Sequence, residues 1–500
     1  MSAVKQEAFK NPLLYSDQEI DQLPADTCKS LLKYFRREYG CVVDRLNLNS
    51  TNSSLSPSSN SLTSLHSTND PVSPTRKCKE KKEAAPPTQK TRKKRDKGYG
   101  RTQKHAITAE QSHLPSCCEK CSHVFLDSHE AVSYTSFNQL DLAKSGLGDY
   151  HLINTLHVLK QRTCDCGHVS RFKFNKIQTS EEKIQLSSWR LVGPQLAATI
   201  VFWMKQIGTT SSKVRCILDN LYNIKLSIGT INRVVIESGL AAQPIHHELK
   251  KEIQSADLVY ADETGWPEAG KKKWLWVFVT KTIGYFEIGR RTVDFVSSVL
   301  PDDFSGVLMS DGYAAYRHFE VRMRCWAHLL RKAKGLSESS DNEGQYVGKT
   351  ILNILNNLMD SIYQAREENK RSVRLESFES LSMLRTICEM VKLQFTHKKS
   401  VSFVTEFLRD WDAIFYILDH PDMPLTNNEA ERALRHWVIL RRLTQGTRTP
   451  LGSTVQGVLA SMIETAKRRG KNFLTLMTDV IKKARLGLDV SKLLIAESAI

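Results

Sequence analysis

Apolar and polar positions in the second half of the chain predict short strands followed by helices. Three segments have the apolar pattern of strands and are separated by short turns, which predicts an antiparallel meander: residues 256–262, 274–280 and 283–288. Residues 291–300 then show apolar side chains at helical spacing, and Pro301 ends that helix. Residues 306–310 predict a fourth strand.

The order strand, strand, strand, helix, strand, helix predicts an α/β fold of the ribonuclease H-like type with a mixed sheet. In that fold the first and fourth strands lie side by side. The first predicted strand ends at Asp262 and the fourth ends at Asp311. The fold would therefore bring these two carboxylates together.

Helical periodicity dominates the segments before and after this core. Within the predicted helical region 181–254, three patterns stand out: residues 195–206, 213–222 and 230–239. The last two predict a helix-turn-helix whose recognition helix would carry Asn232 and Arg233, although the pattern also fits packing or dimerisation. Residues 342–423 are predicted to form a helical insertion in this α/β core.

Three acidic peptides carry the candidate chemistry. Asp262 and Asp311 follow predicted strands, and a helix that begins near Thr426 carries Glu429 and Glu431. Clustered hard oxygen ligands of this kind hold pairs of divalent cations for phosphodiester chemistry. Each residue alone also fits a turn or a helix N-cap, but three adjacent carboxylates would repel one another without cations. Amphipathicity does not choose between the two glutamates, because both flank the same apolar stripe.

Length and composition are consistent with a folded, non-membrane protein. The 500 residues are 40% hydrophobic, and no apolar run approaches the roughly 18 to 20 residues of a membrane span. The N-terminus lacks the apolar core of a signal peptide, so a cytoplasmic location is expected. The 11 cysteines are then interpreted as thiols or metal ligands rather than as disulfides.

The net charge of +17 indicates a polyanionic partner. Residues 47–110 combine a polar tract with a basic arm and are predicted to be disordered, because they cannot bury enough apolar surface. The arm contains four consecutive basic residues: Arg92, Lys93, Lys94 and Arg95. It would bind DNA phosphates without sequence preference, or serve only as a solvated linker.

Two cysteine pairs predict a small zinc-binding module over residues 111–180: Cys118 with Cys121, and Cys164 with Cys166. Four thiolates can close a tetrahedral zinc site. The second pair is tighter than the usual spacing, and Cys117 and His168 are alternative ligands. The other interpretation is a set of reduced cysteines without metal in a short sheet.

From about residue 116 to 492 the chain resembles the transposases of the insertion-sequence-sixty-six family. The shared motifs occur in the family's order: Asp262-Glu-Thr, Ser310-Asp-Gly-Tyr, Cys325-Trp-Ala-His328, Asn427-Asn-Glu-Ala-Glu-Arg432 and Ser461-Met-Ile-Glu-Thr-Ala-Lys467. The resemblance implies a catalytic triad of Asp262, Asp311 and Glu431, since the family's recurrent Glu directly precedes Arg. It also implies two Mg²⁺ or Mn²⁺ ions, a structural Zn²⁺ region, and an N-terminal helix before an Asn- and Ser-rich linker.

Basic residues near these motifs are expected to contact DNA phosphates, although a charge run is more often a solvated face. They are Arg331 and Lys332 after the Cys-Trp-Ala-His peptide, and Arg432 and Arg435 after the triad Glu. The predicted domains are an N-terminal helical segment (1–46), the linker (47–110), the zinc module (111–180), the helical region (181–254), the ribonuclease H-like catalytic domain (255–341 and 424–480), the helical insertion (342–423) and a C-terminal tail (481–500).

The resemblance implies a DNA transposase that binds the ends of an insertion sequence and catalyses metal-dependent cleavage and strand transfer. Its expected partners are the element ends, target DNA, further copies of itself in a homodimer or larger oligomer, and accessory proteins of the same element. The expected location is the prokaryotic cytoplasm, associated with the nucleoid. Two alternatives are a catalytically inactive, domesticated relative that regulates by binding DNA, and a ribonuclease H-type nuclease, which would need neither the zinc module nor the insertion.

Overall fold

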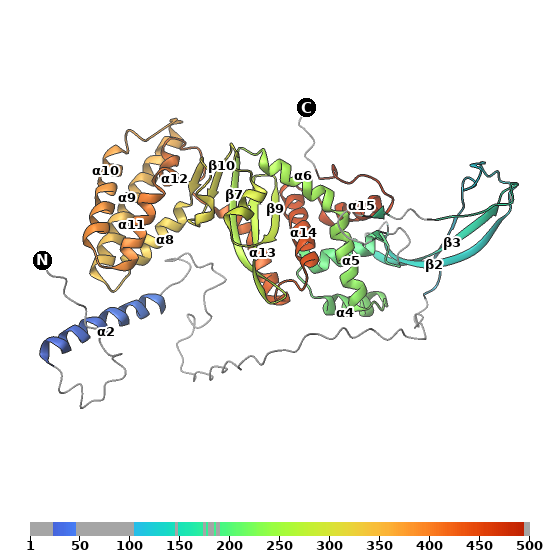
Figure 1. Cartoon of the computed structure of the whole chain (residues 1–500), viewed down its shortest axis with the longest axis horizontal. Coiled ribbons are helices and arrows are strands. Elements are labelled where there is room, and N and C mark those ends of the chain that lie inside the picture. The colour runs from blue at the N-terminus through green and yellow to red at the C-terminus, as the bar shows by residue number, and fades with distance from the viewer. Residues whose placement is uncertain are drawn as a thin grey trace. The chain divides into compact units, whose positions relative to one another are not determined.

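The structure, a computed structural model, describes residues 24–46, 105–145, 149–173, 177–178, 185–186 and 191–494 (Figure 1). It divides into two compact units. Unit 1 contains Met309–Tyr313, Val321–Asn427 and the segment that ends at Pro71, and unit 2 contains the rest. Most of the predicted linker, including Arg92, Lys93, Lys94 and Arg95, lies outside the described residues.

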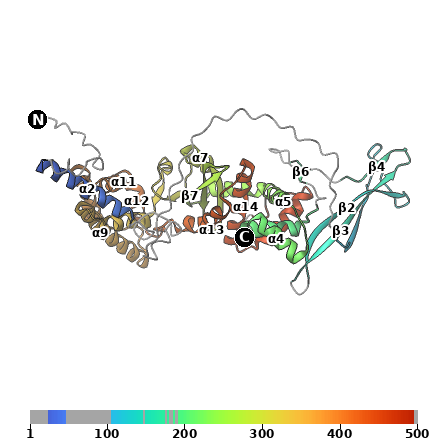
Figure 2. The same cartoon turned by 90° about the horizontal axis from the view of Figure 1, so that it is seen from below.

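Unit 2 begins with a small sheet built around a long hairpin (Figure 2). Its strands are β1 (Ala109–His113), β2 (Ala131–Lys144), β3 (Tyr150–Thr163) and β4 (Val169–Arg171). β2 and β3 pair antiparallel, while β1 lies parallel to β3 and β4 pairs with the end of β3. A separate two-stranded sheet joins β5 (Ile177–Gln178) to β6 (Gln185–Leu186). The cysteine pairs therefore lie next to strands.

Five helical segments follow: α3 (Pro194–Val201), the π-helix η4 (Phe202–Gln206), α4 (Ser211–Tyr222), α5 (Ile228–Ala241) and α6 (Gln243–Gln254). The three predicted helical patterns are confirmed, with boundaries shifted by a few residues. The Thr210 and Ser227 side chains cap α4 and α5 by accepting hydrogen bonds from backbone N–H groups of their first turns. The two helices pack against each other, as a helix-turn-helix requires.

The central sheet of unit 2 contains β7 (Leu258–Glu268), β8 (Lys271–Val279), β9 (Gly284–Gly289) and the start of β10 (Val307–Ser310), in the order β10-β7-β8-β9. The predicted antiparallel meander is confirmed. The prediction that the first strand ends at Asp262 is wrong, because β7 continues for six more residues. The turn lies at Ala269 and Gly270, which both have positive φ angles, and the residues after Asp262 pair with β8 up to that turn.

Helices cover both faces of this meander. The first face lies against α13 (Asn428–Thr444), where Phe286 of β9 meets Trp437 edge-on, and α14 (Pro450–Arg468) packs beside β9. On the opposite face, Trp276 of β8 stacks on Phe295 of α7 (Val293–Val299) and meets Tyr316 of the short η5 helix (Ala314–Tyr316). The last helix, α15 (Phe473–Arg485), packs against α3 and α5.

Unit 1 is mostly helical. It contains the end of β10, β11 (Arg322–Arg324) beside it, α8 (Trp326–Ser337), α9 (Asn342–Glu367), α10 (Phe378–Gln394), α11 (Lys398–Arg409), α12 (Trp411–Phe415) and the short η6 (Tyr416–Leu418). The helical character predicted for residues 342–423 is confirmed. The predicted N-terminal helix appears as α2 (Ala25–Leu46), and residues before 24 lie outside the described part. Across the described ranges, no helix is long and apolar enough to span a bilayer.

Candidate catalytic and zinc-binding sites

Asp262 lies on the sheet face that α13 covers. Directly opposite residues in antiparallel strands share a face, and Asp262 pairs with Val277, which pairs with Phe286. Phe286 contacts Trp437 of α13, the helix that carries Glu431. Arg441, further along α13, donates to Thr264 Oγ1 at 3.0 Å and to the Gly265 carbonyl. Thus Asp262 and Glu431 belong to two elements of unit 2 that pack directly together.

Glu263, the next residue of the Asp-Glu-Thr motif, lies on the opposite face and has a structural role. Its carboxylate accepts hydrogen bonds from Arg291 Nε at 2.9 Å, Arg291 Nη2 at 2.7 Å and the Tyr316 hydroxyl at 2.7 Å. The side chain is only 2% exposed. No motif in the sequence predicts this interaction. The alternation of side chains along a strand is the signal that separates the roles of Asp262 and Glu263.

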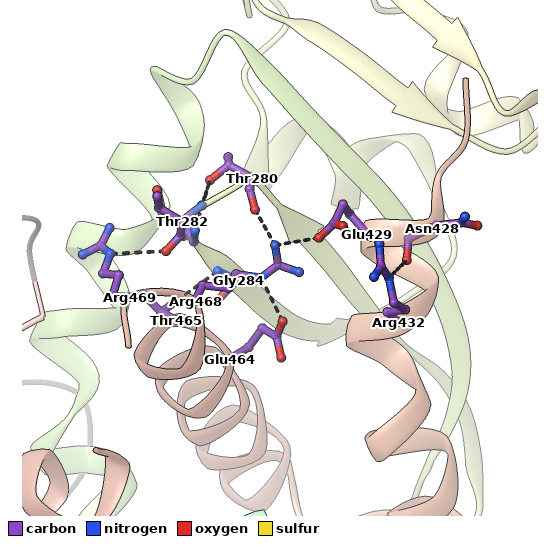
Figure 3. A network of polar contacts seen from close by, with 11 residues as sticks. Thr280, Thr282, Gly284, Asn428, Glu429, Arg432, Glu464, Thr465, Arg468 and Arg469 are labelled. Atoms are coloured by element: carbon purple, nitrogen blue, oxygen red, sulfur yellow. Dashed lines mark hydrogen bonds and ion pairs between the residues drawn. The ribbon is translucent and has the colours of Figure 1, made fainter. Parts of the chain in front are cut away.

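Glu429, in the first turn of α13, forms ion pairs with two arginines (Figure 3). Arg468 of α14 lies 3.0 Å from Glu429 Oε2, and Arg432 lies 2.7 Å from Glu429 Oε1. Arg468 also pairs with Glu464 at 2.8 Å and donates to the Thr280 carbonyl at 2.6 Å. Glu429 therefore attaches the start of α13 to α14. Arg432 and Arg435, both predicted to contact DNA, are exposed, and Arg432 is also paired with Glu429.

Arg468→Ala is expected to lower the free energy of unfolding by about 2 to 4 kcal/mol, because it leaves two partly buried carboxylates without their common partner. Chemical denaturation followed by circular dichroism measures this change. The matched control is Lys467→Ala, which removes an exposed basic side chain from the same turn of α14. Equal stability of the two variants would show that the Arg468 ion pairs contribute little.

The Ser461-Met-Ile-Glu-Thr-Ala-Lys467 peptide of α14 covers the edge of β9. Ser461 and Thr465 of α14 accept hydrogen bonds from the backbone N–H groups of Phe286 at 2.7 Å and Gly284 at 3.0 Å. Both residues belong to the Ser461-Met-Ile-Glu-Thr-Ala-Lys467 peptide. Since β9 is the last strand of the meander, α14 satisfies backbone groups that would otherwise be unpaired.

A basic groove of about 300 Å³ lies along the projecting end of the β7–β8 hairpin. It is lined by Gly265, Trp266, Pro267, Gly270, Lys271, Lys272, Lys273 and Arg441. All of its charged residues are Lys or Arg. Such a surface attracts phosphate groups.

Asp311 directly follows β10 and belongs to unit 1. Its Oδ1 accepts a hydrogen bond from the Tyr313 backbone N–H at 2.8 Å, so the residue makes the local turn that the sequence also suggested. Asp262 and Glu431 belong to unit 2, and the triad remains a prediction.

The other predicted DNA contacts have different surroundings. Asn232 and Arg233 are exposed on the first half of α5, and Asn232 Oδ1 accepts from Ser211 Oγ at 2.6 Å. In unit 1, Arg331 donates to the Ala327 carbonyl of its own helix at 3.1 Å. Lys332 lies 2.7 Å from Glu406 Oε2. Asn232 and Arg233 are therefore the residues of this group that an approaching duplex could reach most directly.

The four predicted zinc ligands lie together in unit 2. Their Sγ atoms are all within 4.8 Å of one another: Cys118, Cys121, Cys164 and Cys166. Cys118 Sγ lies 3.7 Å from Cys166 Sγ, and Cys121 Sγ lies 3.5 Å from Cys164 Sγ. Tetrahedral zinc with Zn–S bonds of about 2.3 Å requires sulfur atoms about 3.8 Å apart. The residues therefore fit a zinc ion.

The pKa values of two of these thiols are shifted in opposite directions. A hydrogen bond from the Cys121 backbone N–H lowers the pKa of Cys118 to about 6, against the opposing effect of burial. The Cys166 backbone N–H favours the Cys164 thiolate, but burial and the neighbouring thiols outweigh it and raise the pKa of Cys164 to about 12. A divalent cation bound here would favour the thiolate form of Cys164, because thiolates are the form that binds metal.

A second group of metal-ligand residues lies nearby but is better explained by hydrogen bonding. Its members, His123, His129 and Asp165, have ligand atoms within 4.8 Å of one another. The Leu126 backbone N–H donates to His129 Nδ1 at 3.2 Å, so the ring proton lies on Nε2, which faces Asp165 Oδ2 at 3.7 Å. A ring nitrogen that carries its proton cannot bind a metal.

Comparison with known proteins relates the chain to one family. The family model described as "Transposase IS66 family" matches residues 190–454. "Uncharacterized protein y4qI" of Sinorhizobium fredii (strain NBRC 101917 / NGR234) is 24% identical over 288 residues, which cover 51% of this chain and 53% of that protein. "Uncharacterized protein y4jD" of the same strain is 22% identical over 291 residues, covering 52% and 57%.

The chain spans about half the length of the curated relatives it matches. The matched family region includes Asp262, Asp311 and Glu431, and it covers more than half of the 500 residues. The chain belongs to the IS66 family of transposases.

Proposed function

We propose that this chain is a DNA transposase that binds the ends of an insertion sequence and catalyses metal-dependent cleavage and strand transfer. The observation that carries the proposal is family membership over the region that contains all three acidic motifs. Its catalytic residues would be Asp262, Asp311 and Glu431.

A ribonuclease H-like catalytic fold is part of this proposal. The supporting observation is the strand order, in which β10 lies beside β7, the first strand of the meander, rather than beside β9. A second is that α13, the helix after the insertion, covers the same sheet face on which Asp262 lies.

The proposed active site would hold two Mg²⁺ or Mn²⁺ ions on the three carboxylates, whose hard oxygen atoms suit these ions. When bound, the ions would activate the attacking hydroxyl and stabilise the leaving oxygen of an in-line displacement. The protein would contribute by restricting the positions of the three carboxylates. Pairing of β7 with β8 restricts Asp262, and the contact of Arg441 with Thr264 and Gly265 restricts α13.

Zinc in the Cys118, Cys121, Cys164 and Cys166 site would have a structural role. It would tie the segment before β2 to the end of β3, because each strand region supplies one cysteine pair. The closed set of four thiolates leaves no position for a substrate.

DNA would be bound on several surfaces of unit 2. Support comes from the basic groove beside Arg441 and from the exposed Asn232 and Arg233 on a helix-turn-helix pair. The chain would assemble on DNA as a homodimer or larger oligomer. Accessory proteins of the same element would be its further partners. Its location would be the prokaryotic cytoplasm, in association with the nucleoid.

The test is incubation of the full chain with labelled duplexes that carry the inverted repeats flanking its gene, with Mg²⁺ or with chelator. The expected result is metal-dependent nicking of these duplexes and not of scrambled ones. Tight, salt-sensitive binding to the repeats without nicking would instead support the DNA-binding regulator.

A further inference from the structure

One buried and one largely buried carboxylate of unit 1 converge on one arginine near Asp311. Arg324 ends β11 and is 1% exposed, and its guanidinium pairs with Glu406 of α11 and with Asp410, the residue after α11. Asp410 is also 1% exposed, and it accepts a further hydrogen bond from Arg322 at 2.8 Å. Since a buried guanidinium requires compensating charge, these partners fix Arg324 in place.

The chain immediately after Asp311 rests on this cluster. A Cβ atom built on Gly312 would lie 2.6 Å from Arg324 Nη2 and 2.7 Å from Glu406 Oε1. The position therefore has no room for a side chain. The Asp311 carboxylate accepts from the Tyr313 backbone N–H, which ties it to the same turn. The Asp311 turn is therefore packed closely against the ends of the Arg324 and Glu406 side chains.

We propose that Arg324, Glu406 and Asp410 form a positioning cluster that holds the Asp311 carboxylate in its metal-binding place. This inference rests on the proposed function. According to this inference, α11, in the middle of the helical insertion, helps to position a metal ligand. The inference also assigns Lys332, which pairs with Glu406, to this cluster.

The alternative is that the cluster only stabilises unit 1. Metal affinity separates the two roles, because a purely stabilising ion pair does not change how a folded protein binds Mn²⁺. Residues that orient metal ligands typically change metal affinity by about 10- to 100-fold when they are replaced.

The experiment titrates Mn²⁺ into the full-length, zinc-loaded chain by calorimetry. It compares wild type with Asp410→Asn and Gly312→Ala, at a temperature where circular dichroism shows each to be folded. Asp311→Ala is the reference for loss of a ligand. The matched control is Asp419→Asn, which removes a carboxylate that lies 2.6 Å from Arg374 in the same insertion.

Both test variants are expected to bind Mn²⁺ at least about tenfold more weakly, and the control within about twofold of wild type. Wild-type affinity in the folded test variants would overturn the inference. If Asp410→Asn does not fold, the Mn²⁺ affinity of Gly312→Ala tests the inference alone, since that variant removes no charge. Unchanged Mn²⁺ binding by Asp311→Ala would overturn the proposed metal site itself, and the inference with it.

Discussion

Glu431→Gln is expected to slow metal-dependent DNA cleavage by about a thousandfold or more, whereas Glu429→Gln should slow it by less than about tenfold. The amide of Gln retains the shape of the side chain but removes the negative charge that a divalent cation requires. Glu429 differs because Arg468 and Arg432 already occupy its carboxylate. Single-turnover cleavage of end-labelled DNA in Mg²⁺ measures both rates.

One further variant and one correction for stability make this comparison specific. Asp262→Asn should lose as much activity as Glu431→Gln. Glu429→Gln is expected to lose stability through the Arg468 pair, so its rate must be expressed per folded molecule. Near wild-type cleavage by Glu431→Gln, with loss in Glu429→Gln, would transfer the metal-binding role to Glu429 and contradict the proposed triad.

Cys164→Ser is expected to release zinc and to unfold the β1–β4 module. Structural zinc sites of this type contribute about 10 kcal/mol or more of apparent binding free energy, which a small module cannot replace by packing. Few apolar side chains of the module support it, since the buried cluster at the site consists of Cys118, Phe125 and Cys164. The measurements are zinc content by mass spectrometry and chymotryptic cleavage of residues 105–173.

Cys117→Ser is the matched control, because Cys117 is exposed and adjacent to the site but is not one of the four converging thiols. It should retain about one zinc ion per chain. Loss of zinc in this control, with retention in Cys164→Ser, would show that the ligand set includes Cys117 instead. A zinc-free wild-type chain with an intact module would contradict the structural role.

The meander could be predicted because its strands are apolar and separated by turn residues. The length of β7 could not, since Gly265 and Pro267 are residue types that are depleted in strands. Their strand conformation depends on pairing with Trp274 and Lys272 of β8. For the same reason, the sequence placed Asp262 at the end of a strand rather than within one.

Motif order identified the family, but it could not assign roles within each motif. Glu263 and Glu429 each lie within two residues of a proposed catalytic carboxylate, and they pair with Arg291 and Arg468, which are 28 and 39 residues further along the chain. The Arg324 cluster could not be predicted from the sequence either, because its two carboxylates lie 82 and 86 residues further along the chain. Such pairings depend on tertiary packing rather than on local pattern.

The proposed transposase chemistry is tested by mapping the DNA ends that the purified wild-type chain produces on its own inverted repeats. A transposase of this kind is expected to cut at the element boundaries, to leave free 3′-hydroxyl groups, to require Mg²⁺ or Mn²⁺, and to lose this cleavage with Asp262→Asn. Cuts that persist in chelator, or that leave a protein joined covalently to the DNA, would contradict this proposal.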